Sequence, residues 1–234
     1  MINNTLIEIC IGNIQDAIKA ASYPIDRIEL NSALELGGLS PSIETVRSLK
    51  KMINVPLCCM CRPRGGDFFY SEVEYETMLK DAEEMLKAGA DGIVFGFLNE
   101  DRTIDLKRTG AMSDLVHSYH REAVFHKAFD ETDDLDRSVR GLISCGIDRI
   151  LTSGKAVYPD ILKGCEILHD LNEKYRGQIS LLPGGGVRIE NIQDVLKISG
   201  CGQVHMTSKK QSQGGYLELD EAQLQEMLKK IESM

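Results

Sequence analysis

Arg27-Ile28-Glu29-Leu30-Asn31 is one of six short apolar runs in the chain that end in a charged or polar cluster. The strands of a parallel barrel behave in this way, because each contributes a few side chains from its end to one shared pocket. The pattern therefore predicts a barrel scaffold with one convergent pocket. The other five clusters are Cys61-Arg62-Pro63-Arg64, Phe125-His126-Lys127, Thr152-Ser153, Gly184-Gly185-Gly186 and Val204-His205-Met206-Thr207.

A recurring unit organises the chain between these clusters. An amphipathic helical segment ends at a glycine, a short polar step follows, and a β-branched run begins, as at 88–94, 145–151 and 200–204. Glycine after a helix supplies the left-handed residue that closes the last turn. Helix starts are also readable, since Ser71-Glu72-Val73-Glu74 has the spacing of a capping box. Asn13, Ser40-Pro41 and the acidic run 130–134 predict further helix starts.

Eight strands are expected to alternate with helices over residues 1–234, as one α/β domain. This is the pattern of a single (β/α)8 TIM-type barrel. An open doubly wound sheet is the alternative, but it usually has a Gly-rich turn after its first strand, and Ile11-Gly12-Asn13 is not one. The candidate strands are Leu6–Cys10, Arg27–Leu30, Val55–Cys61, Gly92–Gly96, Glu122–Phe125, Arg149–Leu151, Ile179–Leu182 and Gln203–His205.

Composition and charge narrow the class of protein. The chain has 234 residues, 42% of them hydrophobic and 27% charged. These values are typical of a folded globular protein with a large core. Its net charge of −9, without any basic run, argues against nucleic acid as a partner. The start of the sequence does not resemble a secretory signal, and no apolar stretch is long enough to span a membrane. Seven cysteines, an odd number, fit reduced thiols, so we expect a cytoplasmic protein without a membrane partner.

Ionisable side chains at the strand ends are the candidates for catalysis. Barrel closure would bring together Glu8, Glu29, His126 and His205 with the cations that follow the third strand. Carboxylate and imidazole exchange protons near neutral pH, and arginine holds a planar anion with two hydrogen bonds. A purely structural interpretation stays open for each residue. The glutamates could pair with Arg27 or Arg149 inside the barrel, and the histidines could be hydrogen-bonded core residues.

Three loops are candidates for binding a small anion. Arg62 and Arg64 flank a proline in a Gly-rich segment, 62–68, that can bend close to a ligand, although Arg–Asp contacts could equally hold such a loop. Gly184, Gly185 and Gly186 follow the seventh strand, where barrels often bind phosphate; the alternative is a flexible turn. The third loop starts at the end of the sixth strand and supplies the hydroxyls of Thr152 and Ser153.

The metal hypothesis depends on the cysteines. Thiolates and thioethers are the soft ligands that select Cu(I), and both occur in Cys58-Cys59-Met60-Cys61, with Cys10 on the first strand. Strand alternation places Cys59 and Cys61 on one face, with Cys58 and Met60 on the other, so these four cannot close on one ion. Core packing is the favoured interpretation of this run.

Taken in order, several motifs resemble the CutC family, which is named for copper homeostasis. They are Glu8-Ile9-Cys10, Arg27-Ile28-Glu29-Leu30, the Gly37–Ser42 and Arg62–Phe68 segments, Phe125–Asp130, Ile150–Gly154 and Val204-His205. The resemblance extends to about Ser208, and the remainder is expected to form a last barrel helix.

The resemblance implies a cytoplasmic barrel, often a homo-oligomer, that binds copper or takes part in its trafficking. It implies Cys10 as a Cu(I) ligand, together with the residue after the Arg-Ile-Glu-Leu run. That residue is Asn31 here, and an amide is a poor ligand for a soft monovalent ion. The arginine that follows the phenylalanine-histidine pair in the family is Lys127, which keeps the charge but loses the two-pronged geometry.

Two functions are therefore compatible with the sequence. One is a copper-handling protein. The other is a metal-independent barrel enzyme that performs acid/base chemistry on a small anionic molecule, for which a phosphorylated substrate is one option.

Overall fold

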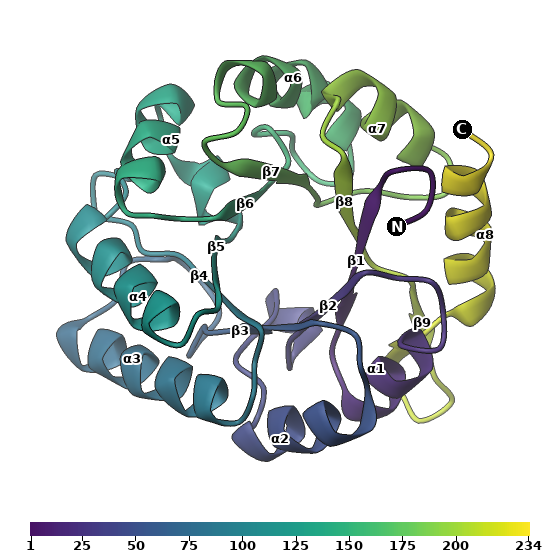
Figure 1. Cartoon of the computed structure of the whole chain (residues 1–234), viewed down its shortest axis with the longest axis horizontal. Coiled ribbons are helices and arrows are strands. Elements are labelled where there is room, and N and C mark those ends of the chain that lie inside the picture. Colours follow the sequence, from purple (N-terminus) through teal and green to yellow (C-terminus); the bar gives the residue numbers. More distant parts are fainter.

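Eight parallel strands form a nearly closed barrel surrounded by helices, in a computed structural model that describes residues 1–234 (Figure 1). The strands are hydrogen-bonded in the order β7-β6-β5-β4-β3-β2-β1-β8. Across the remaining seam, the Gln203 side chain on β8 donates to the carbonyl of Leu181 on β7 at 3.1 Å. The fold is thus the predicted (β/α)8 TIM-type barrel. The strands are β1 (Leu6–Ile11), β2 (Arg27–Leu30), β3 (Leu57–Met60), β4 (Gly92–Phe95), β5 (Glu122–Phe125), β6 (Arg149–Thr152), β7 (Ser180–Pro183) and β8 (Gln203–Met206).

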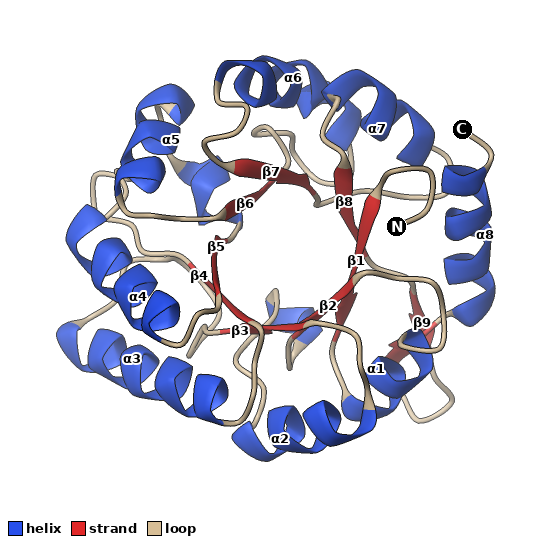
Figure 2. Cartoon of the chain, in the orientation of Figure 1, coloured by secondary structure: helices blue, strands red, loops and turns tan.

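The helices form an outer ring around the strands (Figure 2). The capping box at Ser71 and Glu74 forms as predicted and starts α3, and the side chains of Asn13 and Asp134 cap α1 and α5. None of the helices combines the length and the hydrophobicity of a membrane-spanning segment. The helices are α1 (Ile14–Ala20), α2 (Ile43–Met52), α3 (Glu72–Lys87), α4 (Leu106–Ser118), α5 (Leu135–Ser144), α6 (Cys165–Lys174), α7 (Ile192–Ser199) and α8 (Glu221–Glu232), with short 3-10 turns η1 (Leu34–Leu36), η2 (Lys127–Glu131) and η3 (Ile161–Gly164).

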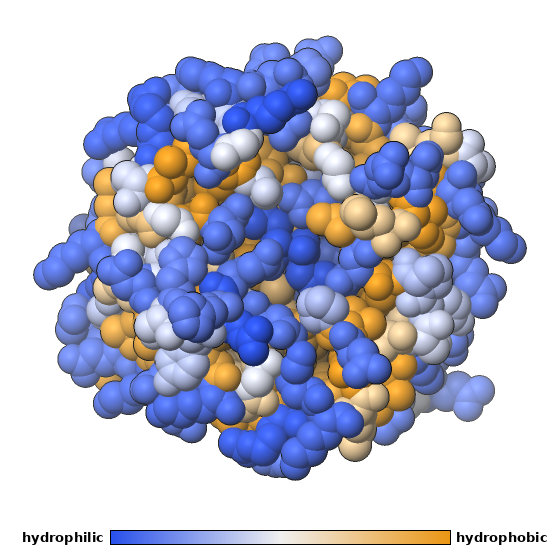
Figure 3. All heavy atoms as spheres, in the orientation of Figure 1, coloured by the Kyte–Doolittle hydropathy of each residue, from blue (hydrophilic) through white to orange (hydrophobic).

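Strand alternation separates an apolar layer from a polar barrel interior. Ile7 and Ile9 on β1 are fully buried in the core shared with the helices, whereas Glu8 between them contacts Arg27 and His205. On β3, Cys59 joins that same outer core, while Cys58 packs with Met60 in a small separate cluster. The predicted division of this cysteine run between two faces is confirmed. On the face shown in Figure 3, hydrophilic residues gather over the centre of the barrel.

Two local predictions are wrong. Ser40 does not cap a helix, because its hydroxyl accepts from the amide of Arg62 at 2.9 Å; the cap of α2 is Ser42. The segment after Ser208 does not pass directly into the last helix either. It first forms an antiparallel hairpin of β9 (Lys209–Gln211) and β10 (Leu217–Leu219), which the amide of Leu219 ties to Asp16 of α1 at 2.8 Å.

Candidate functional site

A buried acid–base pair lies where β1 pairs with β8. The register places Glu8 directly opposite His205, and the Glu8 carboxylate is 2.7 Å from Nδ1 of the imidazole. The other carboxylate oxygen accepts from Nε of Arg27 and is 3.9 Å from Arg149. These residues are at most 7% exposed. The ion network that the structural interpretation of Glu8 required is present, and it includes a histidine.

The charges of this pair are set by its neighbours. Burial opposes ionisation of Glu8, but Arg27, His205 and Arg149 outweigh it and hold the pKa of Glu8 well below its usual range. Burial likewise disfavours the imidazolium, but the carboxylates of Glu29 and Glu8 raise the pKa of His205. The pair is therefore stabilised as carboxylate and imidazolium.

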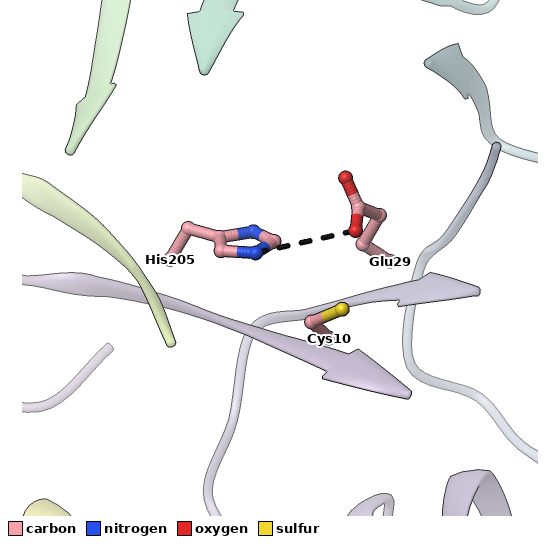
Figure 4. A group of neighbouring side chains, drawn as sticks. All are labelled: Cys10, Glu29 and His205. Carbon is pink, nitrogen blue, oxygen red and sulfur yellow. Dashed lines mark ion pairs between the residues drawn. The ribbon is translucent and has the colours of Figure 1, made fainter. Parts of the chain in front are cut away.

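Cys10, Glu29 and His205 meet at the neighbouring ends of β1, β2 and β8 (Figure 4). One potential ligand atom from each lies within 4.8 Å of the other two, and Nε2 of His205 is 4.0 Å from a Glu29 oxygen. Asn31 donates to Glu29 at 2.7 Å and to the Cys10 sulfur at 3.4 Å. The second Glu29 oxygen is buried without a hydrogen-bond partner. The three ligand groups thus converge on one point.

The donor set of this cluster is suited to a metal ion. Thiolate and imidazole bind copper, and the Glu29 oxygen that faces His205, to which Asn31 also donates, is a further donor. Hydrogen bonding of Nδ1 to Glu8 leaves Nε2 of His205 as the ligand atom, which is the common arrangement around metal-binding histidines. Loss of hydration, followed by the Glu29 carboxylate, raises the pKa of the Cys10 thiol well above its usual value. A metal would therefore have to displace a proton from Cys10.

The other cysteines do not extend this cluster. Burial raises the pKa of Cys58 to about 12 and that of Cys165 and Cys201 to about 11. Cys59 and Cys61 are fully buried in the outer core. Their surroundings suit packing, as favoured from the sequence.

His126 and Arg62 form a second polar group at the strand ends. Burial and then the Arg62 charge lower the pKa of His126 to about 3, so its imidazole is neutral. Its Nδ1 accepts from the amide of Ala128 at 3.1 Å, while Nε2 is buried without a partner. Arg62 donates to the carbonyls of Gly37 at 3.1 Å and Gly66 at 2.8 Å, and Phe68 packs against both side chains. Nε of Arg62 also remains unpaired.

Arg64 does not share this environment. Its guanidinium donates to Glu74 at 2.6 Å, to Asp67 at 3.1 Å and to the carbonyl of Phe69 at 2.7 Å. These contacts match the interpretation of the loop as one held together by arginine and acidic residues. A ligand role for Arg64 stays a prediction.

Thr152 and Ser153 donate their hydroxyls to one carboxylate. Asp130 accepts from Thr152 at 2.6 Å and from Ser153 at 3.0 Å, and it also accepts from the ammonium of Lys127 at 2.8 Å. This network connects β6 to the η2 turn. Asp130 organises the loop, and the sequence hides this role because the residue stands in an acidic run that is typical of a helix start.

The triple glycine lies beside a cavity of about 200 Å³. Gly184 packs against β8, since a Cβ there would be 3.0 Å from that of His205. Gly185 and Gly186 line the cavity together with His205, at positive φ angles of 92° and 115°. Arg188 and Lys209 also line it, and the sequence reasoning missed both. A basic residue two positions after the last glycine was the only available signal.

Fold and site together define a TIM-barrel protein with a polar interior and a cluster of cysteine, glutamate and histidine at its mouth. The model of the CutC family matches residues 5–210, and the chain belongs to the CutC family. The CutC family protein of Treponema denticola is 42% identical over 207 residues, covering 88% of this chain and 82% of that protein. The human "Copper homeostasis protein cutC homolog" is 36% identical over 213 residues, covering 91% of this chain and 77% of that protein.

Solved structures agree with this assignment. A CutC structure from Streptococcus agalactiae has a TM-score of 0.81 at 29% identity, covering 88% of this chain and 98% of that one. Phosphoribosylanthranilate isomerase from Thermotoga maritima has a TM-score of 0.62 at 13% identity, covering 98% and 100%, and shows the shared fold alone.

Proposed function

We propose that this chain binds a copper ion at the barrel mouth through Cys10 and His205, with Glu29 as a third ligand, and that binding serves copper homeostasis. The convergence of these three donors within 4.8 Å carries the proposal. The name of the human relative supports the choice of copper. Cu(I) is the form expected beside reduced thiols.

The chemistry of the surrounding residues supports the same site. When bound, copper would be held by one sulfur and one nitrogen, which are good donors for it, and Glu29 would offset its charge. Glu8 orients the imidazole from behind, and Asn31 orients both the Glu29 carboxylate and the Cys10 thiol.

Anaerobic titration of the purified protein with Cu(I), against a competing chelator, tests the proposal. We expect one equivalent to bind, and Cys10→Ser and His205→Gln to abolish that binding. Cys145→Ser is the matched control, since Cys145 is also partly exposed but lies at the end of α5, outside this cluster. Absence of stoichiometric binding, or binding that survives Cys10→Ser, would contradict the proposal. A parallel Zn²⁺ titration reports selectivity.

A second candidate function is acid/base catalysis on a small anionic molecule. The observation that favours it is His205 between two carboxylates, with Nε2 directed toward Glu29 (Figure 4). In this role His205 would move the proton and Glu8 would orient it. Exchange of substrate C–H protons in D2O, followed by NMR over a panel of phosphorylated keto and aldehyde compounds, tests it. Exchange should persist with a copper chelator and disappear in His205→Gln; no exchange on any compound would count against it.

A homo-oligomeric state and a cytoplasmic location stay predictions. Size-exclusion chromatography with light scattering measures the first, and cell fractionation measures the second.

A further inference from the structure

The cavity between the loops after β7 and β8 has an unusual charge for this protein. Lys127, Arg188 and Lys209 line it, and no carboxylate does. The chain as a whole has a net charge of −9, so a wall with three cations and no acid is not typical of its surface. Such a wall attracts a small anion.

The basic side chains differ in how far they are already neutralised. Lys127 is paired with Asp130 at 2.8 Å. Arg188 is held instead by uncharged groups, since it donates to the carbonyl of Val187 and to the hydroxyl of Tyr158, each at 2.7 Å. Lys209 forms no ion pair, whereas Lys210 beside it lies 3.9 Å from Glu218. Arg188 and Lys209 thus keep their full charge for a ligand.

Backbone amides add uncharged donors at the same place. Gly185, Gly186 and Val187 line the cavity, and their amide groups make no hydrogen bond within the chain. Free backbone amides are uncharged donors that an anion can accept from. Glycine is needed at 186, because φ is 115° and a Cβ would lie 2.3 Å from the carbonyl oxygen of Pro159.

We propose that this cavity binds the phosphate group of a small phosphate monoester. A dianion matches two unpaired cations and several free amides better than a single carboxylate does. A volume of about 200 Å³ accommodates a phosphate and only a few further atoms. His205 lines the cavity, so the organic part of the ligand extends toward the imidazole and Glu29. If the bound phosphate monoester is a substrate, this inference rests on the second proposed function, acid/base catalysis. Phosphate binding by itself depends on neither proposed function.

Isothermal titration of the intact protein with inorganic phosphate, glycerol 3-phosphate and glycerol tests the inference. We expect saturable binding of the two phosphates and none of glycerol. Arg188→Gln and Lys209→Gln should each weaken binding by about tenfold, the effect of one charge-assisted hydrogen bond. Lys210→Gln is the matched control, from the next position on the same strand, and should bind normally.

Phosphate binding that is absent, or that Arg188→Gln and Lys209→Gln leave unchanged, would overturn the inference. Binding of inorganic phosphate alone, without the monoester, would also overturn it, because it would show a site too small for the organic part. Cu(I) titration and D2O exchange are measured on the same variants. They test the two proposed functions separately from phosphate binding, so a failure of this inference is distinguishable from a failure of either function.

Discussion

Replacing Glu8 with glutamine should strongly destabilise the barrel. The substitution keeps the shape and a hydrogen-bond acceptor for Arg27 but removes the charge that faces Arg27, Arg149 and His205. Glu8 is 2% exposed, so water cannot replace that charge. Removing one partner of a buried ion pair costs about 3–5 kcal/mol. Arg149 keeps a contact to Glu122 at 2.9 Å, and we therefore expect about 3 kcal/mol, at the lower end of that range.

Urea denaturation at neutral pH measures this loss as a change in the free energy of unfolding. Glu122→Gln is the matched control. It also removes a carboxylate that pairs with Arg149, but the Glu122 side chain is 47% exposed. An exposed pair contributes less than about 1 kcal/mol. If Glu8→Gln also cost less than about 1 kcal/mol, the ion network would not stabilise the interior, and the reasoning would be refuted.

The same variant should change how stability depends on pH. Because folding lowers the pKa of Glu8, its contribution is present above the unfolded carboxyl pKa of about 4.3 and is lost as pH falls through the folded value. Folding raises the pKa of His205, so that contribution is present below about pH 6.5 and is lost as pH rises through the folded pKa. Glu8→Gln should abolish the first effect and reduce the second, and NMR titration of His205 should show a lower pKa.

Three further predictions concern the metal site and the fold. Asn31→Cys should tighten Cu(I) binding, because the Asn31 side chain lies 3.4 Å from the Cys10 sulfur and a second thiolate suits Cu(I). Chelator competition measures the change in affinity, with Asn31→Ser as the control. Copper affinity should fall as pH falls, because Cys10 and His205 must lose protons to bind copper and both have raised pKa values. Chelator competition at pH 6 and pH 8 measures the direction of this change. Protons released into a weakly buffered solution on binding provide an independent check. Ser71→Ala should cost about 1 kcal/mol by thermal unfolding through loss of the α3 cap, and an unchanged stability would show that the capping box is dispensable.

Strand periodicity is sufficient to predict the barrel and the polar residues inside it. A run such as Arg27–Leu30 carries its own β signal, and glycines that close the preceding helices mark where β4, β6 and β8 begin. Gly146 and Gly200 have the expected positive φ angles, 72° and 64°. Once eight strands close, β8 must lie beside β1. The meeting of His205 with Glu8 therefore follows from strand order alone.

The loops are less predictable, because partners distant in the sequence decide their conformation. Nothing local indicates that Ser40 will bind the backbone of Arg62, or that Asp130 will hold Thr152 and Ser153. The cavity beside Gly185 is equally hidden, since it needs Lys209 from the hairpin after β8. Local patterns identify residues at strand ends, but tertiary contacts decide which of them keep free hydrogen-bonding groups.

Charge balance links the metal cluster to the neighbouring cavity. A metal that binds Cys10 and His205 replaces two protons, so a divalent ion leaves the net charge of the cluster unchanged, while Cu(I) makes it more negative by one. His205 borders the cavity in which Arg188 and Lys209 would hold a phosphate. Added negative charge at that border weakens binding of a dianion, because the low-dielectric barrel screens charges poorly. By linkage, phosphate must weaken Cu(I) binding to the same degree. Copper and a phosphate monoester are therefore expected to be antagonistic ligands of one barrel mouth.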